Sequence, residues 1–210
     1  MHMRGVVAAG LMTLGFAHAA MAAAPVIPAG ADWRAIITPA DQIRLDNLAA
    51  TRASAIAEAE AAIAAKEQNA LEASDFRDVL DAETIAATDR DVIGRYRCRV
   101  AKLGGQYLQL IRYPFFNCRI QQGPDGSLVI QKLSGSQRLI GRLWLEPDAL
   151  SYVYLGTTYV NDDQPIAYNV DPKENSVGRL YRIGSDRLRL ELPTPYYEST
   201  MDVFELVRRR

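Results

Sequence analysis

Short β-type runs, separated by clusters of turn residues, fill the chain from Ile93 onward. A parallel crossover between two strands needs a dozen or more residues, whereas a hairpin can turn with two. The spacing of these runs therefore predicts a mainly antiparallel sheet of about eight or nine strands. We expect these strands near residues 94–101, 107–113, 115–121, 127–133, 138–145, 151–159, 179–183, 187–192 and 202–207.

The order of apolar residues within the runs indicates which faces of the sheet are covered. Apolar and charged residues alternate strictly over residues 187–192, which predicts one solvent-facing side. Residues 128–130 and 139–145 are largely apolar on both sides, so they need a core within and cover outside. A small barrel either fills its interior with side chains or holds one small ligand there. We expect such a barrel, closed or nearly closed, with a two-sheet sandwich as the alternative.

Residues 32–91 are rich in alanine and contain no tyrosine. Thr38, Pro39 and Asp41 are typical of a helix start, because threonine caps free N–H groups, proline suits the first turn and an acid follows. Apolar residues then recur at helical intervals, which predicts a helix over residues 39–66 and a shorter one over residues 71–80. The fold class is therefore α+β, with an N-terminal helix or helix pair packed on the mainly antiparallel β-barrel or sandwich.

The helical and β parts carry opposite net charge. Residues 32–92 hold 13 acidic and 6 basic residues, and residues 93–210 hold 12 acidic and 17 basic residues. An acidic helical part docked on a basic sheet accounts for both signs without an external partner. We expect one α+β domain over residues 33–207, helical over 38–90 and β over 93–207. Residues 208–210 form a solvated basic tail, too short to indicate nucleic-acid binding.

A signal peptide is predicted at the start of the chain. Arg4 is followed by an apolar stretch over residues 6–16 and by Ala20-Met21-Ala22, which forms an A-x-A cleavage site. The apolar stretch is about half of the roughly 20 residues that a membrane span requires. We therefore expect residues 1–22 to be cleaved and residues 23–32 to be flexible, with no stable membrane span left. The mature protein would lie outside the cytoplasm, in the periplasm of a Gram-negative host.

Both histidines, His2 and His18, lie in this leader. A mature chain without histidine has no Ser-His-Asp triad, no Cys-His pair and no histidine metal ligand. A calcium loop at residues 171–175 is disfavoured, because proline and lysine stand where oxygen ligands are needed. We expect no metal and no cofactor, and enzymatic activity is less expected than binding.

Cys98 and Cys118 are the two cysteines of the chain. In an oxidising compartment such a pair forms a disulfide, and closing a loop of about 20 residues stabilises a fold by roughly 3 kcal/mol. A redox or nucleophilic cysteine would need C-x-x-C spacing or a histidine neighbour, and the mature sequence offers neither. We expect a structural disulfide.

Two segments are candidates for binding an anion. Arg97 lies with two further arginines on one face of an expected strand, where they could bind an anion. The preferred interpretation is a solvated face, or one that is neutralised by helix acids such as Glu58, Glu60 or Glu67. Residues 132–138 form a polar hairpin whose backbone N–H groups could build an anion-binding nest. This segment is not a Walker motif, because it is flanked by two expected strands and does not open a helix. The candidate anion-binding or ligand-binding residues are Arg97, Lys132, Ser134, Ser136 and Arg138.

Acids and tyrosines allow two further interpretations. Glu191 and Glu205 could face the barrel interior together, as a hydrolase with two carboxylates requires. The tyrosines could line a cavity, although tyrosine is also an ordinary strand residue, which is the preferred interpretation. The tyrosines concerned are Tyr152, Tyr154, Tyr159, Tyr168 and Tyr181, with Tyr196 and Tyr197 at the mouth.

Motifs spread along the chain are typical of one bacterial family. They are Trp33-Arg34, Tyr96-Arg97-Cys98-Arg99, Cys118, the run over residues 132–138, Glu198-Ser199 and Asp202-Val203-Phe204-Glu205-Leu206. With them the chain resembles the family known as domain of unknown function 4893, from about Trp33 to Leu206. The resemblance implies an exported protein with two cysteines, and it implies no activity, substrate or catalytic residue.

Three classes of function follow from these observations. The first is non-enzymatic binding of a small or lipidic ligand in the barrel, and the second is interaction with an envelope protein, which a large exposed apolar patch would favour. The third is a histidine-free hydrolase that uses carboxylates or a Ser-Lys pair. The volume and lining of the space inside the strands discriminate between them, because a solidly filled interior would contradict the first class.

Overall fold

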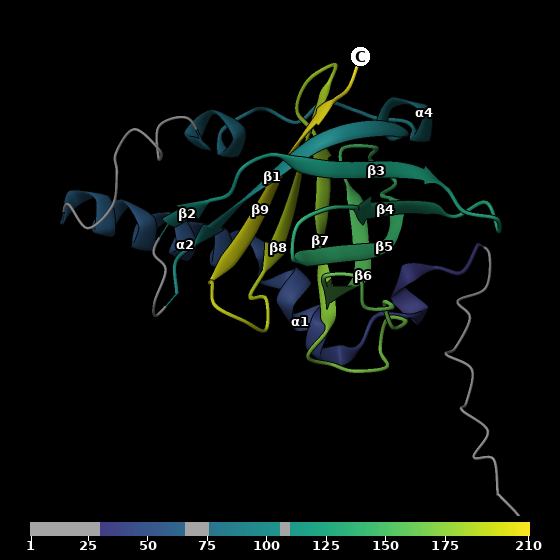
Figure 1. Cartoon of the computed structure of the whole chain (residues 1–210), viewed down its shortest axis with the longest axis horizontal. Helices are drawn as coiled ribbons and strands as arrows, with labels where there is room; N and C mark the ends of the chain where they lie inside the picture. Colours follow the sequence, from purple (N-terminus) through teal and green to yellow (C-terminus); the bar gives the residue numbers. More distant parts are fainter. Residues whose placement is uncertain (1–29, 66–75, 106–109) are drawn as a thin grey trace, which may run out of the picture.

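Nine strands form one antiparallel sheet that closes into a barrel (Figure 1). The computed structural model describes residues 30–65, 76–105 and 110–210. Strands β3 to β9 follow one another around the sheet and β9 pairs with β1, so eight strands close the ring and β2 pairs with β1 alone. The strands are β1 (Gly94–Leu103), β2 (Leu110–Arg112), β3 (Phe116–Gln122), β4 (Leu128–Lys132), β5 (Gln137–Leu145), β6 (Tyr152–Val160), β7 (Asn175–Arg182), β8 (Arg187–Pro193) and β9 (Met201–Arg208).

The closed antiparallel barrel confirms the first of the two expected architectures. One strand boundary differs clearly from the expectation, since β7 begins at Asn175 rather than near residue 179. Ser176 and Gly178 interrupt the apolar pattern there, yet they pair with Gly156 and Tyr154 of β6. Pairing with a neighbouring strand therefore extends β7 beyond what its own residues indicate.

The interior of the barrel is filled by its own side chains along most of its length, and Tyr96, Tyr152 and Tyr154 are the bulkiest of them. Gly141 and Gly156 make room for Tyr154, because a Cβ added at either glycine would lie 2.4 Å from that side chain. Along this filled part, the packing leaves no room for a ligand inside the barrel. The other buried apolar residues of this core on the ring strands are Cys98, Val100, Cys118, Ile120, Leu128, Ile130, Leu139, Leu143, Leu180, Leu188, Leu190, Leu192, Phe204 and Leu206.

The N-terminal helices cover part of the outer face of the barrel (Figure 1). They are η1 (Trp33–Ala35), α1 (Pro39–Asp46) and α2 (Leu48–Ala64), and a short α4 (Asp89–Val92) leads into β1. Helix α1 contacts β7, whereas α2 contacts β1, β8 and β9. The expectation of one helix over residues 39–66 is therefore wrong, because the chain turns at Asn47 and each helix packs on its own strands of a curved surface. Residues 76–80 are helical, and the rest of the helix expected over residues 71–80 lies outside the described residues.

The contacts between helices and sheet do not follow the expected separation of charge. Arg52 of α2 pairs with Glu191 of β8 at 3.3 Å, so the base lies on the helix and the acid on the strand. Glu58 accepts hydrogen bonds from the segments that follow β1 and precede β9, and Glu60 pairs with Arg77. Individual partners, rather than net charge, therefore decide how α2 docks.

Asp41 ties α1 to the barrel. The Thr38 side chain caps the helix as expected, since its hydroxyl accepts from the Asp41 N–H. The Asp41 carboxylate, 3% exposed, accepts hydrogen bonds from the Tyr168 hydroxyl at 2.6 Å and the Asn175 side-chain amide at 2.9 Å. It also pairs with Arg44 at 2.8 Å. One buried carboxylate thus connects the helix start to the start of β7.

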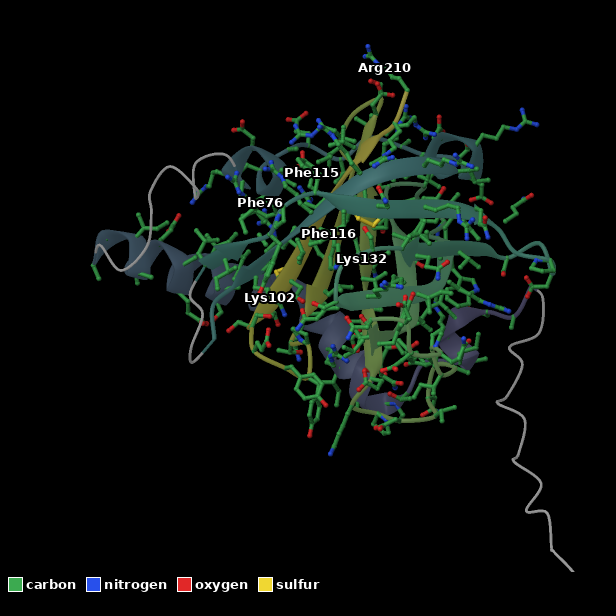
Figure 2. The ribbon with its side chains drawn as sticks, viewed as in Figure 1. Phe76, Lys102, Phe115, Phe116, Lys132 and Arg210 are labelled. Carbon is green, nitrogen blue, oxygen red and sulfur yellow. A yellow bond between two sulfur atoms is a disulfide. The ribbon has the colours of Figure 1, made fainter. Side chains whose placement is uncertain are left out.

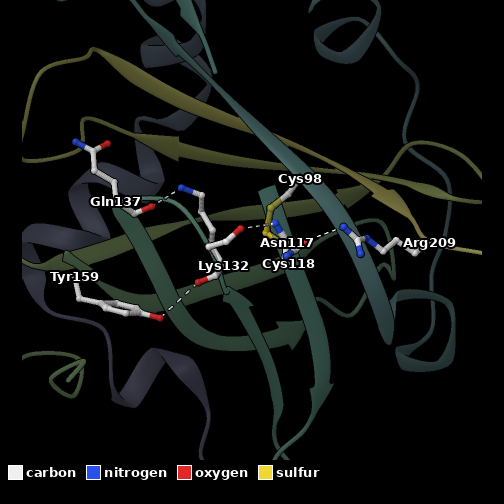
Figure 3. Close-up of a disulfide and its surroundings, with 8 residues drawn as sticks. Cys98, Asn117, Cys118, Lys132, Gln137, Tyr159 and Arg209 are labelled. Carbon is white, nitrogen blue, oxygen red and sulfur yellow. Dashed lines mark hydrogen bonds between the residues drawn. A yellow bond between two sulfur atoms is a disulfide. The ribbon is translucent and has the colours of Figure 1, made fainter. Parts of the chain in front are cut away.

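A disulfide joins Cys98 of β1 to Cys118 of β3 inside the barrel (Figure 3). Both residues are buried. The bond links two adjacent strands of the ring, in agreement with the expected structural role.

The N-terminal segment and the C-terminal basic tail are both assigned from the sequence. The expected signal peptide over residues 1–22 lies outside the described residues, as does most of the segment over 23–32. Among the helices that are described, none has the length and apolar character to span a membrane. At the other end the Arg208 side chain donates to the Ile93 carbonyl at 2.6 Å and the Arg209 N–H to the Arg95 carbonyl at 2.8 Å. Within the expected basic tail, Arg209 and Arg210 are exposed and Arg208 is half-buried.

Candidate functional site

One end of the barrel is not filled and contains a cavity of about 210 Å³, here called the mouth cavity. It lies where β1, β4, β6 and β8 end and where β5, β7 and β9 begin. Figure 2 shows the labelled Lys102 and Lys132 near each other at this end. Its lining includes the apolar or aromatic residues Val100, Leu139, Tyr159, Val160, Leu192, Pro195, Tyr196, Tyr197 and Phe204, and the charged residues Arg44, Lys102, Lys132, Arg138, Lys173, Glu174 and Asp202.

Lys132 is the inward-facing residue at the end of β4. It follows Leu128 and Ile130 on the inner face and is only 4% exposed. Its ammonium group donates to the Gln137 carbonyl (Figure 3) and lies 4.2 Å from the centre of the Phe116 ring. Among the residues that the structure describes, no carboxylate lies within ion-pair distance of Lys132, in contrast to most of the cations around it.

The surroundings of Lys132 disfavour its charged form. Burial lowers the pKa of its amine to about 8, with the charges of Arg138 and Lys102 acting in the same direction and Asp202 acting against them. Near neutral pH the group therefore remains a cation, and above pH 8 it becomes mostly a neutral amine.

Lys102 differs from Lys132 although it is equally buried. It lies opposite Asp202 across the β1–β9 pairing, at 3.6 Å, and it pairs with Glu198 at 2.9 Å. Burial alone would lower the pKa of Lys102, but the two carboxylates outweigh burial and raise it. Asp202 in turn accepts a hydrogen bond of 2.6 Å from the Ser199 hydroxyl. Lys102 is therefore neutralised by the protein itself, whereas Lys132 is not.

The rim of the mouth cavity combines exposed aromatic and basic side chains. Tyr196 and Tyr197, 57% and 51% exposed, come from the loop between β8 and β9, and their rings meet edge to face. Lys173 lies 5.7 Å from the centre of the Tyr196 ring. Arg138 pairs with the exposed Asp162 at 3.0 Å. A ligand entering the cavity would thus pass an apolar and basic rim.

The sequence that forms this fold matches the model of a known family. Residues 33–206 match the model of a family described as domain of unknown function (DUF4893). The chain belongs to the DUF4893 family. The match extends over η1, both long helices and nearly all of the barrel, and so includes the mouth cavity. No curated protein matches the chain in sequence.

Two of the five candidate binding residues of this DUF4893 domain line the mouth cavity, namely Lys132 and Arg138. The Ser134 hydroxyl accepts from the Asn117 N–H, and Ser136 uses its carbonyl to bind the Asn161 N–H, so both stabilise the loop between β4 and β5 instead. These two serines do not line the cavity.

Arg97 lies on the outer face of the DUF4893 barrel. Its guanidinium group covers the Phe115 ring at 4.6 Å from the ring centre. The helix acids expected to neutralise this face have other partners or, in the case of Glu67, lie outside the described residues. Arg97 is therefore remote from the mouth cavity, because alternate residues of β1 face opposite sides of the sheet.

Glu191 and Glu205 also lie on the outer face, which rules out the possibility that they face the barrel interior together. Glu205 pairs with Arg99 and Arg187, both at 2.5 Å, and Glu191 pairs with Arg189 at 2.8 Å. Their strict alternation with inward-facing leucines and Phe204 places them outside.

The tyrosines divide into three groups. Tyr152 and Tyr154 fill the interior, whereas Tyr159, Tyr196 and Tyr197 line the mouth cavity, as in the less favoured of the two interpretations. Tyr168 and Tyr181 lie outside the barrel, where they contact Asp41 and Arg189.

Lys102 and Asp202 belong to the site although neither is among the five candidates. The same alternation that places Tyr96, Cys98 and Val100 inside also places Lys102 inside. Lys102 could have been predicted from the sequence, because it follows Tyr96, Cys98 and Val100 at the two-residue spacing of the inward-facing side of a strand. Among the described residues, no group of three potential metal-ligating side chains comes together.

Proposed function

We propose that this DUF4893 protein is a non-enzymatic binding protein that takes up a small amphipathic anion in the mouth cavity. The observation that carries the proposal is Lys132, a buried cation with no carboxylate partner among the described residues, which faces a largely apolar cavity. Burial of an unpaired cation is costly, and an anionic ligand would offset that cost. Lys173 and Arg138 at the rim would attract the same ligand.

The size of the cavity limits the ligand. A cavity of about 150 Å³ holds one benzene molecule, and sites for drug-sized ligands occupy about 300–1,000 Å³. The mouth cavity, at about 210 Å³, lies between these limits. We therefore propose a ligand with one ring or a short acyl chain and one carboxylate.

Phenylacetate is a suitable probe, because it joins one ring to one carboxylate. Lys132→Met removes the cation but keeps a long apolar side chain, and we expect it to weaken phenylacetate binding about tenfold or more, as for loss of a hydrogen bond to a charged group. Isothermal titration calorimetry measures the change. Arg97→Gln is the matched control, since it removes one positive charge from the outer face and should leave the affinity unchanged. Equal affinities of the wild type and Lys132→Met would contradict the proposal.

Lys132→Met is also expected to stabilise the unliganded protein. The lowered pKa means that burying the charged Lys132 costs the folded state about 3 kcal/mol at pH 7, and the variant avoids this cost. The variant also loses the hydrogen bond to Gln137, worth about 1 kcal/mol, so its free energy of unfolding should rise by about 2 kcal/mol. Between pH 8 and 10.5 Lys132 is protonated in the unfolded wild type but mostly neutral in the folded one. The stability of the wild type should therefore rise with pH across this window, whereas that of the variant should not. Urea unfolding at several pH values measures both effects. A less stable variant would show that the charge of Lys132 supports the fold.

We further propose that the protein acts in the periplasm. The leader composition and the disulfide between Cys98 and Cys118 support this location. Protein recovered from the periplasm of a Gram-negative host should begin at Ala23, which N-terminal sequencing would establish. A chain that still begins at Met1 would contradict export by cleavage.

A further inference from the structure

We propose that the amine of Lys132 condenses reversibly with the carbonyl group of a small α-keto acid bound in the mouth cavity. This inference deepens the proposed function and rests on it, because the α-keto acid is a carboxylate of the proposed size. It adds a covalent bond between the ligand and one named side chain.

The position of Lys132 meets the first requirement for such a bond, which is access of the amine to the ligand. Lys132 lines the mouth cavity, and the partners of its ammonium group are a backbone carbonyl and the face of the Phe116 ring. A ligand can replace both without breaking an ion pair. Lys102 lines the same cavity but would have to leave Glu198 and Asp202.

The neighbouring charges meet the second requirement, which is a supply of neutral amine. A lysine becomes nucleophilic when it is desolvated in an apolar pocket or placed beside another cation, and Lys132 has both. Arg138 of β5 and Lys102 of β1 disfavour its proton, and Asp202 of β9 favours it. With a pKa of about 8, about a quarter of the Lys132 side chains are neutral at pH 7.5, against roughly one in a thousand for an ordinary lysine.

The reaction balances without an oxidant or a further reactant. The nitrogen lone pair of Lys132 attacks the keto carbon, and a proton moves from nitrogen to oxygen to give a carbinolamine. A proton from solvent, equivalent to the one that the Lys132 ammonium group released, is added to the carbinolamine hydroxyl, the carbon–oxygen bond breaks and water leaves, which yields a protonated imine. The neighbouring ligand carboxylate pairs with this cation and with Arg138, so the cavity keeps the charge balance of the non-covalent complex.

Reductive trapping tests this inference on the wild-type protein. Phenylpyruvate and sodium cyanoborohydride are added, and peptide mass mapping locates the secondary amine that forms. We expect modification of Lys132 at least about tenfold above each of the other lysines, namely Lys66, Lys102 and Lys173. The initial rate of trapping, corrected for the reductant alone, should rise with pH around a midpoint near 8. Lys132→Arg keeps the cation and should still bind phenylacetate, but it should give no specific product.

The outcomes separate the inference from the proposed function. If phenylacetate binds and Lys132 is not trapped, or if the product is spread evenly over the lysines, the covalent step is overturned and non-covalent binding stands. If phenylacetate does not bind and Lys132 is not trapped, both proposals are overturned. Trapping confined to Lys132 supports the covalent step.

Discussion

Asp41→Ala is expected to lower the free energy of unfolding by about 3–5 kcal/mol, as for loss of one partner of a buried ion pair. The carboxylate binds Arg44, Tyr168 and Asn175, and without it the buried Tyr168 hydroxyl and Asn175 amide lose this acceptor, while Arg44 loses its ion-pair partner. Because these contacts join α1 to the start of β7, loss of the carboxylate should loosen the helix from the barrel. Urea unfolding followed by circular dichroism measures the change.

Asp46→Ala is the control for this prediction, because Asp46 is exposed on the same helix and its replacement should change stability by no more than about 0.5 kcal/mol. Burial by itself would raise the pKa of Asp41, but hydrogen bonds from Tyr168 and Thr38 and the charge of Arg44 lower it below 3.8. Asp41 therefore contributes its full stabilisation at a pH above the pKa that it has in the unfolded chain. This stabilisation is lost as the pH falls through the lower pKa that Asp41 has in the folded protein. Equal stability of the two variants at pH 7 would show that Asp41 does not anchor the helix.

Replacing both cysteines by alanine is expected to lower the free energy of unfolding by about 3 kcal/mol, because the disulfide closes a loop with a sequence separation of 20. For a domain of this size the thermal midpoint should fall by about 6–12 °C. Scanning calorimetry measures the shift. Adding a reductant to the wild type should reproduce most of it, and a midpoint that the reductant leaves unchanged would contradict a stabilising disulfide.

Much of the fold could be predicted because its decisive features are local. Runs of alternating residues with short connections indicate an antiparallel sheet before any pairing is known, and all nine strands lie near their expected positions. The start of β7 at Asn175 could not be predicted, because polar residues and a glycine form a strand there only through the partners that β6 supplies. The turn at Asn47 likewise depends on the curvature of the surface on which α1 and α2 pack.

The site was predictable only in part, because it depends on contacts between distant segments. Lys132 and Arg138 come from one hairpin, which the sequence shows directly. Lys102 meets Asp202 only because β1 pairs with β9, about a hundred residues later in the chain. The direction of Glu191 and Glu205 depends on which face of each strand turns inward, and that becomes certain only once the ring closes.

The pairing of β1 with β9 also has a consequence for biosynthesis. During synthesis β9 (Met201–Arg208) follows all the other strands of the ring, so β1 and β8 keep open hydrogen-bonding edges until β9 has been made. A nascent or truncated chain without β9 would expose two unpaired strand edges to its neighbours, and this eight-residue strand covers both at once. Self-association should therefore be the hazard of incomplete synthesis in this protein, and a chaperone that shields strand edges would be the appropriate protection.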